Sequence, residues 1–236
     1  MTRAVKPRTQ AKASAKPRER VRRQPERARQ AILKAALVEF AQEGVAGART
    51  DHIARAARVN KALIYYYFHD KEALYGAVLD QVFSGLAATI NQVLDRDLPL
   101  REKVLAYAGA HFDYIAASPL NPRLVQREMM RAGRKGSPHI RQIVERHLRP
   151  IQGRLAQLFR AGMESGDFRR VDAAHFVFSI VAMNVFYFSS APVIALLSHA
   201  DPLAPEAIAA RRRAVLDLIA AALFTPSPAT AGGSKA

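Results

Sequence analysis

Cysteine and tryptophan are both absent from the 236 residues of this sequence. Without cysteine, the chain forms no disulfide bond and holds no metal ion through thiolate ligands. The N-terminus also lacks an apolar signal region and is instead dense in Arg and Lys. We therefore expect a cytoplasmic protein.

Motifs for catalysis are missing as well. The sequence contains no Gly-rich phosphate loop, no His-Glu-x-x-His zinc motif and no Ser/His/Asp arrangement for nucleophilic attack. We therefore predict a protein that is not an enzyme, with no catalytic residue, no metal site and no cofactor.

Acidic residues are scarce relative to basic ones. The chain has 36 Lys and Arg against 20 Asp and Glu, a formal net charge of +16, and residues 1–29 alone carry eleven basic and two acidic side chains. Such an excess favours a polyanionic partner, either nucleic acid or an anionic membrane surface. Taken alone, the basic N-terminus is explained equally well as a solubilising tail.

Charged residues are absent between Ala173 and Ala200, and the segment from Phe176 to Leu197 is long enough to cross a bilayer. Pro192 would break a helix there, and acidic residues rather than basic and aromatic ones flank the segment. We interpret it as a helix that is buried on more than one side of a water-soluble protein, without membrane contact.

Helical periodicity dominates what is present. Half of the residues are hydrophobic, enough for a substantial core, and strand-type alternation is absent. We predict an all-α fold with a disordered basic arm over 1–25, a small helical domain over 26–72, a larger helical bundle over 73–224 and a disordered tail over 225–236. Beyond Pro99, the expected helices span about 100–117, 122–132, 137–164, 172–190 and 204–224.

The segment from Thr50 to Leu74 predicts two short helices, a three-residue turn and the start of a longer helix. Thr50 is expected to cap the first short helix and Asn60 the second, and Asp70 the longer helix that follows. Two short helices joined in this way fit a helix-turn-helix, whose second helix lies in the major groove of DNA.

Helical register separates two faces of the second short helix, with Ile64 and Phe68 one turn apart and facing the core. A tyrosine-rich helix alone is more often part of a core, but the caps, the turn and the basic charge favour DNA. Tyrosine and lysine suit phosphate contacts, lysine can donate to guanine, and apolar side chains can contact thymine methyl groups. The predicted DNA contacts are Arg49, Thr50, Lys61, Ala62, Leu63, Tyr65, Tyr66, Tyr67 and Lys71.

The segment from about Arg27 to Leu79 resembles the N-terminal domain of the TetR/AcrR family of bacterial transcription regulators. The matching residues are Ile32 to Ala36, Phe40, Gly44, Thr50, Ile53-Ala54, Val59, Ile64-Tyr65, Tyr67-Phe68 and Lys71 to Leu74. The resemblance implies an all-helical homodimer that binds a palindromic operator and usually represses. In the family, DNA is commonly contacted from the positions of Thr50, Lys61, Leu63, Tyr65, Tyr66, Tyr67 and Lys71.

The chain departs from the family pattern at two positions. Arg58 stands in the interhelical turn where the family usually has Gly, and Val45 follows the first helix where an aromatic residue is common. If residue 58 is left-handed, Arg costs on the order of 1 kcal/mol there relative to Gly. Neither departure removes a predicted DNA contact.

Residues 100–224 contain no specific motif, and the resemblance implies that they sense a ligand and dimerise. A helix as apolar as 176–188 must be covered on more than one side. This favours a homodimer through the helices near 172–190 and 204–224, paired into a four-helix bundle. The alternative is a central helix of a monomeric bundle.

Polar or soft side chains on apolar helix faces are the candidates for an effector site. For each of them, a satisfied core residue or a space-filling one is the commoner explanation. The candidate ligand-binding residues are Tyr107, His111, Met130, Phe159, Met183, Asn184 and Tyr187. A solvated basic face is expected from Arg127, Arg131, Arg134, Lys135 and Arg141.

These patterns predict a homodimeric DNA-binding transcriptional regulator, in the first place a repressor that a small-molecule effector releases from a palindromic operator in double-stranded DNA. It would be associated with the nucleoid when bound to DNA. The alternative is a nucleoid-associated or cell-division adaptor that uses the same fold to bind DNA and to recruit a protein partner. A small helical enzyme is the third possibility, and no acid/base or nucleophile constellation supports it.

Overall fold

The computed structural model describes residues 17–135 and 137–226, and this part of the chain is all-α, as predicted. Its one pairing of strand type is an isolated antiparallel bridge between Phe168 and Phe224. The helices are α1 (Pro17–Gly47), α2 (Thr50–Ala57), α3 (Lys61–Phe68), α4 (Lys71–Leu94), α5 (Leu100–Ala116), α6 (Leu120–Lys135), α7 (Pro138–Ile143), the π-helix η1 (Val144–Leu148), α8 (Arg149–Glu164), α9 (Ala173–Ser189), α10 (Ala191–Ser198) and α11 (Pro205–Leu223).

Helix α1 begins earlier than the sequence predicted. Disorder was expected up to residue 25, whereas the helix starts at Pro17. Proline is favourable in the first turn of a helix, and the Arg, Glu and Gln residues that follow it are good helix formers. Residues 1–16 of the expected arm and residues 227–236 of the expected tail lie outside the described residues.

The helix predicted over 137–164 is present from Pro138 to Glu164, but a π-helical segment divides it into α7, η1 and α8. The wider turn of η1 comes between α7 and α8. Within η1, Arg146 and His147 both contact the carboxylate of Asp80 on α4, with N–O distances of 3.2 and 2.9 Å. The π-helical turn thus places two consecutive side chains on one acidic group.

The uncharged segment near residue 190 forms two helices rather than one. Helix α9 ends at Ser189, and α10 starts at Ala191 with Pro192 in its first turn. The two helices are bent by 67° relative to one another, so the segment is not a straight span. By length and composition, α4 is the one helix of the described residues that could cross a membrane, but core helices meet the same criterion, and Leu74, Val78 and Ile90 of α4 are buried.

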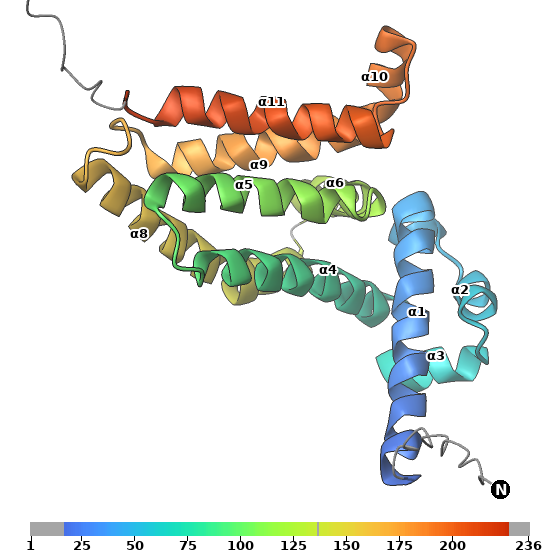
Figure 1. Cartoon of the computed structure of the whole chain (residues 1–236). Helices are drawn as coiled ribbons and strands as arrows, with labels where there is room; N and C mark the ends of the chain where they lie inside the picture. The colour runs from blue at the N-terminus through green and yellow to red at the C-terminus, as the bar shows by residue number, and fades with distance from the viewer. Residues whose placement is uncertain (1–16, 136, 227–236) are drawn as a thin grey trace, which may run out of the picture.

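Helices α1 to α3 form a small unit at one end of the molecule, and α4 runs from it into the body (Figure 1). The core of this unit contains Ile32 and Phe40 of α1, Ile53 of α2 and Ile64 of α3, which are almost fully buried. Near the C-terminal end of α1 the chain kinks at Gly44, whose φ of 68° and ψ of 177° suit only glycine.

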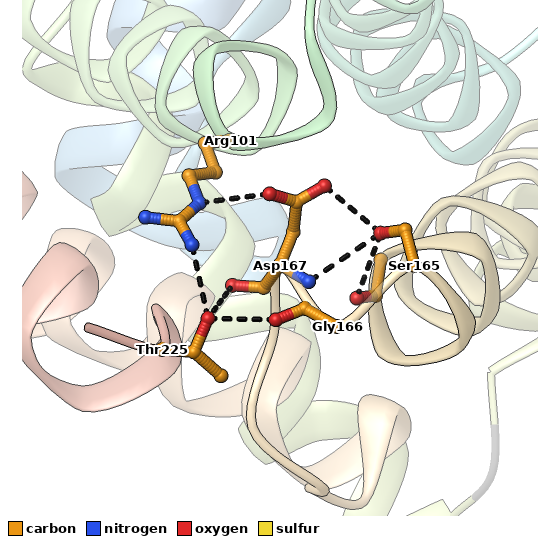
Figure 2. Close-up of polar contacts among 6 residues, drawn as sticks. Arg101, Ser165, Gly166, Asp167 and Thr225 are labelled. Carbon is orange, nitrogen blue, oxygen red and sulfur yellow. Dashed lines mark hydrogen bonds and ion pairs between the residues drawn. The ribbon is translucent and has the colours of Figure 1, made fainter. Parts of the chain in front are cut away.

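The body is a bundle in which α5, α9 and α11 run side by side (Figure 1). Its core contains Val104, Phe159 and Ile180, all fully buried. The far end of the body is tied by a polar cluster, in which the Arg101 guanidinium donates to Asp167 (3.0 Å) and to Thr225 (2.9 Å) (Figure 2). This cluster joins the start of α5, the α8–α9 loop and the residues after α11.

Candidate DNA-binding surface and effector cavity

Helix α2 is fixed at its N-terminus by a carboxylate from α1. The prediction that Thr50 caps this helix is wrong, because Arg49 occupies the capping position and no side chain there accepts a hydrogen bond. The Arg49 amide instead donates to Glu39 Oε1 at 2.9 Å. Thr50 is the first helical residue, and its hydroxyl lies 3.4 Å from the Tyr65 hydroxyl. Two predicted DNA contacts from α2 and α3 are therefore adjacent.

The turn between α2 and α3 adopts the left-handed geometry considered above. Arg58 has φ 56° and ψ 43°, and its N–H is bonded to carbonyls of the last turn of α2. A non-glycine residue costs on the order of 1 kcal/mol in this conformation. Two residues later, Asn60 Oδ1 accepts from Ala62 N at 2.9 Å, which confirms the predicted cap of α3.

Helix α3 ends abruptly in a tight turn at His69. This residue has φ 63° and ψ −54°, and the Asp70 N–H donates to Phe68 O at 2.7 Å across it. These values describe a γ-turn of the rare, strained kind. Asp70 Oδ1 then accepts from Ala73 N at 2.7 Å, which confirms the predicted cap of α4. A single strained residue thus sets the angle between α3 and α4.

The two faces of α3 are those predicted. Ile64 and Phe68 are 1% and 4% exposed in the core, whereas Tyr65 and Tyr66 are 43% and 75% exposed. Tyr67 is half-buried, and its ring lies edge-on to that of Tyr66 at 5.2 Å. Of the other predicted contacts in α3, Lys61 and Ala62 are exposed and Leu63 is half-buried.

Basic groups surround this exposed face. The Lys61 ammonium lies 2.9 Å from Asp51 Oδ1. The hydrogen bond between them raises the pKa of Lys61 and lowers the pKa of Asp51. Exposed pairs of this kind are weak, so the ammonium can exchange Asp51 for a phosphate. Arg49, Arg55 and Arg58 are also exposed on α2 and its flanks.

Lys71 holds a different position from the other predicted DNA contacts. It is half-buried, and its ammonium donates to the carbonyls of Ala46 (3.3 Å) and Ala48 (3.1 Å). In the free protein, Lys71 therefore ties the start of α4 to the end of α1 and to the segment that joins α1 to α2. A DNA contact by Lys71 stays a prediction and would require its ammonium to leave one of these carbonyls.

A cavity of about 350 Å³ lies in the body between α4, α5, α6, α8 and α9. Its walls are mainly apolar, with Leu86 and Ile90 from α4, Val125 from α6, and Val177 and Val181 from α9. Small-molecule sites usually have this character, with few polar groups and volumes of about 300–1,000 Å³. Two other hollows, of about 520 and 870 Å³, are more open and have charged residues in their walls.

Two of the candidate ligand-binding residues line this cavity, and a third supports them. Tyr107 and His111 lie in its wall on α5. Asn184 of α9 is fully buried behind them and donates through Nδ2 to Ala108 O at 3.3 Å and to His111 Nδ1 at 3.0 Å. Burial lowers the pKa of His111 to about 4, so its ring is neutral at physiological pH.

The other four candidates lie outside the cavity, which corrects the sequence-based prediction. Phe159 is fully buried in the body core, and Met183 packs against that core. The Tyr187 hydroxyl donates to Pro202 O at 2.7 Å. Met130 is 63% exposed and lines the open groove between α1, α4 and α6. Apolar side chains on any helix of a bundle look alike in sequence, whichever interface they fill.

Sequence reasoning missed three polar residues in the cavity wall, Tyr114, Asn121 and Gln152. A signal existed for Tyr114, which follows Tyr107 and His111 on the same face of α5 at helical spacing. No comparable pattern marks Asn121 or Gln152, because their position depends on how α6 and α8 pack against α4.

Two basic residues of α6 that were expected on a solvated face are exposed or half-exposed, and they also contact other helices. Arg127 Nη2 donates to Gln42 O of α1 at 2.6 Å. Arg131 Nη2 donates to both carboxylate oxygens of Glu72 of α4, at 3.0 Å each. Arg141 is exposed, as expected, and the side chains of Arg134 and Lys135 lie outside the described part of the structure.

Comparison with known proteins assigns both halves of the chain. Residues 32–78 match the family described as "Bacterial regulatory proteins, tetR family". Residues 101–219 match "Tetracyclin repressor-like, C-terminal domain".

Individual proteins agree with this assignment. The HTH-type transcriptional repressor SCO4008 of Streptomyces coelicolor is 35% identical over 162 residues, which cover 68% of this chain and 78% of that protein. The HTH-type transcriptional regulator RutR of Escherichia coli is 31% identical over 175 residues, covering 73% and 79%. The crystal structure of the transcriptional regulator SCO4942 from Streptomyces coelicolor superposes with a TM-score of 0.62 at 30% identity, covering 81% of this chain and 96% of that one.

Proteins of this family bind DNA and small-molecule effectors and act as dimers, and they are typically not enzymes. Their role as DNA-binding regulators implies a cytoplasmic location. The family matches and the relatives above, together with the exposed face of α3, show that the chain belongs to the TetR family of helix-turn-helix transcriptional regulators.

Proposed function

We propose that this regulator is a homodimeric repressor that a small molecule releases from a palindromic operator. The names of the relatives support repression over the adaptor function considered above. When bound to its operator, the protein is associated with the nucleoid. Three features support the proposal, namely an apolar face suited to a second copy, the exposed face of α3, and a helix shared between cavity and DNA-binding unit.

The apolar face lies on the last three helices. Large hydrophobic side chains there are more than half exposed, at Phe178 and Phe186 of α9 (72% each) and Leu218 of α11 (55%). Helix α10, which the sequence did not predict, adds Val193, Leu196 and Leu197 at 57–78%. Exposed apolar patches of this extent mark association surfaces. Pairing α9 and α11 with their copies about a twofold axis buries them in a four-helix bundle.

Light scattering after size-exclusion chromatography tests this surface. Phe178→Glu with Phe186→Glu should convert the dimer to a monomer, because each interface would then bury four carboxylates without partners. Met130→Glu is the matched control, since Met130 is similarly exposed but lines the groove between α1, α4 and α6. A double variant that remains dimeric would contradict the assignment.

The exposed face of α3 supports a palindromic operator. A twofold dimer presents two copies of this face, and each recognition helix reads one half-site, so the preferred DNA mirrors the protein's symmetry. Selection of bound sequences from a random pool of double-stranded DNA should therefore yield an inverted repeat. Enrichment of single, unrepeated sites would refute this part of the proposal.

Release by an effector rests on one observation, which carries the proposed function. Helix α6 forms part of the cavity wall through Val125 and Met129. The same helix inserts Leu124, which is fully buried, into the core of the DNA-binding unit. Arg127 binds α1 of that unit, and Arg131 binds Glu72 at the start of α4, just after α3. A ligand that displaces α6 from the cavity side must therefore disturb how the DNA-binding unit is held.

A side chain that fills the cavity from α6 imitates the ligand. Val125→Trp should lower operator affinity at least tenfold while the protein remains folded and dimeric, although overpacking costs about 1–3 kcal/mol of stability. Val38→Trp, on the exposed face of α1, is the control and should leave affinity unchanged. A folded Val125→Trp dimer with full operator affinity would contradict coupling through α6. Fluorescence anisotropy measures the affinity and circular dichroism the folded state.

A further inference from the structure

The cavity contains no charged side chain among the described residues that line it. Lys, Arg, Asp and Glu are all missing from its wall, and the lining residues lie in α4, α5, α6, η1, α8 and α9. A carboxylate, phosphate or ammonium group placed there would lose its hydration without gaining an opposite charge, which is strongly unfavourable. The wall therefore selects against ions.

Two of the polar groups in the wall are already occupied by the protein. The Tyr114 hydroxyl donates to Val82 O of α4 at 2.6 Å, and burial raises the pKa of this tyrosine. Glycine at position 85 makes this approach possible, since a Cβ there would lie 2.6 Å from the same hydroxyl. Asn121 is bonded to the Ser118 hydroxyl at 3.1 Å, and Gln152 is exposed to solvent.

His111, which lines the cavity, is fixed as a hydrogen-bond donor through Nε2. Asn184 Nδ2 lies 3.3 Å from the carbonyl oxygen of Ala108, which can only accept, and this contact determines how the amide is oriented. The same Nδ2 must then donate to His111 Nδ1, 3.0 Å away. Since the ring is neutral and Nδ1 accepts, its proton is on Nε2. The one remaining polar atom of this ring is therefore an N–H donor.

Tyr107 adds a second donor one helical turn away. Its side chain is 3% exposed, and its ring centre lies 6.5 Å from that of His111. Within the described residues, its hydroxyl has no hydrogen-bond partner, although a buried hydroxyl is normally bonded. Burial also raises the pKa of Tyr107 well above its ordinary value, so the hydroxyl keeps its proton. Both side chains are more than nine-tenths buried and line the same cavity.

We propose that the cavity binds an uncharged, largely apolar molecule that carries a carbonyl oxygen, and that the Tyr107 hydroxyl and the His111 Nε2–H donate to this oxygen. A carbonyl oxygen has two lone pairs and can accept from both donors at once. The inference rests on the proposed function, because it assigns a chemical class to the effector of that function. Acids, phosphate esters and amines are excluded as effectors of this site.

Calorimetry on the full-length protein without DNA tests the class of ligand directly. The probes are 2-undecanone and cyclododecanone as neutral carbonyl compounds, with decanoate and decylamine as charged compounds of similar size. At least one ketone should bind, and the charged compounds should bind at least tenfold more weakly than that ketone. Equal or tighter binding of a charged compound overturns the proposal, as does the absence of measurable binding by both ketones.

Removing single hydroxyl groups tests the assigned donor. Tyr107→Phe should weaken ketone binding about tenfold, since it removes one hydrogen bond and little volume. Tyr187→Phe is the matched control, because the Tyr187 hydroxyl is bonded to Pro202 outside the cavity, and it should bind like the wild type. Equal affinities of the two variants overturn the role of Tyr107.

The same probes separate this inference from the proposed function. A ketone that binds the free protein but does not release DNA refutes effector release and leaves the ligand class standing. An anion that binds in place of the ketones and releases DNA supports effector release and refutes the ligand class.

Discussion

The face of α3 and the cavity of the body differ most in charge. Around α3, the exposed side chains of Arg49, Arg55 and Lys61 face solvent, and the one acidic partner of Lys61 is an exposed carboxylate that is easily displaced. In the cavity wall, no described residue is charged. One chain thus combines a cationic surface, which suits a polyanion, with a neutral cavity, which suits the uncharged molecule that we propose as its ligand.

This difference in charge explains how each site can be selective for its own ligand. A nucleic acid phosphate is attracted to the surface at long range but is rejected by the cavity, where it would lose its hydration. A neutral apolar molecule gains little at the surface and most in the cavity. In the proposed function, the two sites communicate through α6, by its packing and by the contacts of Arg127 and Arg131.

The largest predicted effect is on the free energy of unfolding, which should fall far more when a buried aromatic side chain is removed than when an exposed one is removed. Phe159→Ala should lower the free energy of unfolding by about 3–5 kcal/mol, since Phe159 is fully buried in the body core. Tyr66→Ala should change it by less than about 0.5 kcal/mol, because Tyr66 is 75% exposed. Urea denaturation measures both. A mild effect of Phe159→Ala would return this residue to the list of cavity candidates.

The second predicted effect is a loss of stability at acidic pH that is caused by His111 in the body. The folded pKa of His111, about 4, is below its ordinary value of 6.5, so between these values the unfolded chain binds a proton more readily. The contribution of neutral His111 to the free energy of unfolding is therefore complete above pH 6.5 and is lost as the pH falls toward 4. The total loss is on the order of 3 kcal/mol. Urea denaturation of wild type and His111→Gln at several pH values isolates this contribution. Parallel pH profiles for the two proteins would show that His111 is not held neutral.

The smallest effect concerns the turn that orients the recognition helix. Arg58→Gly should raise the free energy of unfolding by on the order of 1 kcal/mol, because glycine adopts the observed left-handed conformation without strain. Thermal denaturation measures the change. Arg58→Ala is the control and should give no such gain, since alanine keeps the Cβ that causes the strain.

Prediction from sequence succeeded where local rules decide the structure. The caps at Asn60 and Asp70 and the inward positions of Ile64 and Phe68 follow from residue type and helical spacing alone. Thr50 failed as a cap because the helix already begins at this residue, with Arg49 in the capping position and its amide donating to Glu39 of α1. Such a partner is set by tertiary packing, which no local rule contains.

The cavity shows the same division. Tyr107 and His111 were found because they share one face of one helix. Met130, Phe159, Met183 and Tyr187 were misplaced because the cavity is formed by several helices, and helix periodicity does not reveal which neighbour each face meets. The bend at Pro192 could be predicted, but not that the chain would continue as α10 with exposed apolar side chains.

The most direct test of the central claim is the salt dependence of DNA binding by wild type and by Lys61→Ala with Tyr65→Ala. Fluorescence anisotropy with the selected operator should show a loss of about 10- to 1,000-fold in the variant and a shallower salt slope, because each base contact contributes about 1–3 kcal/mol and each lost phosphate contact reduces the slope by about one. Unfolding free energy should be unchanged. Equal affinity and equal salt slope for the two folded proteins would contradict the assignment of α3 as the DNA-reading surface.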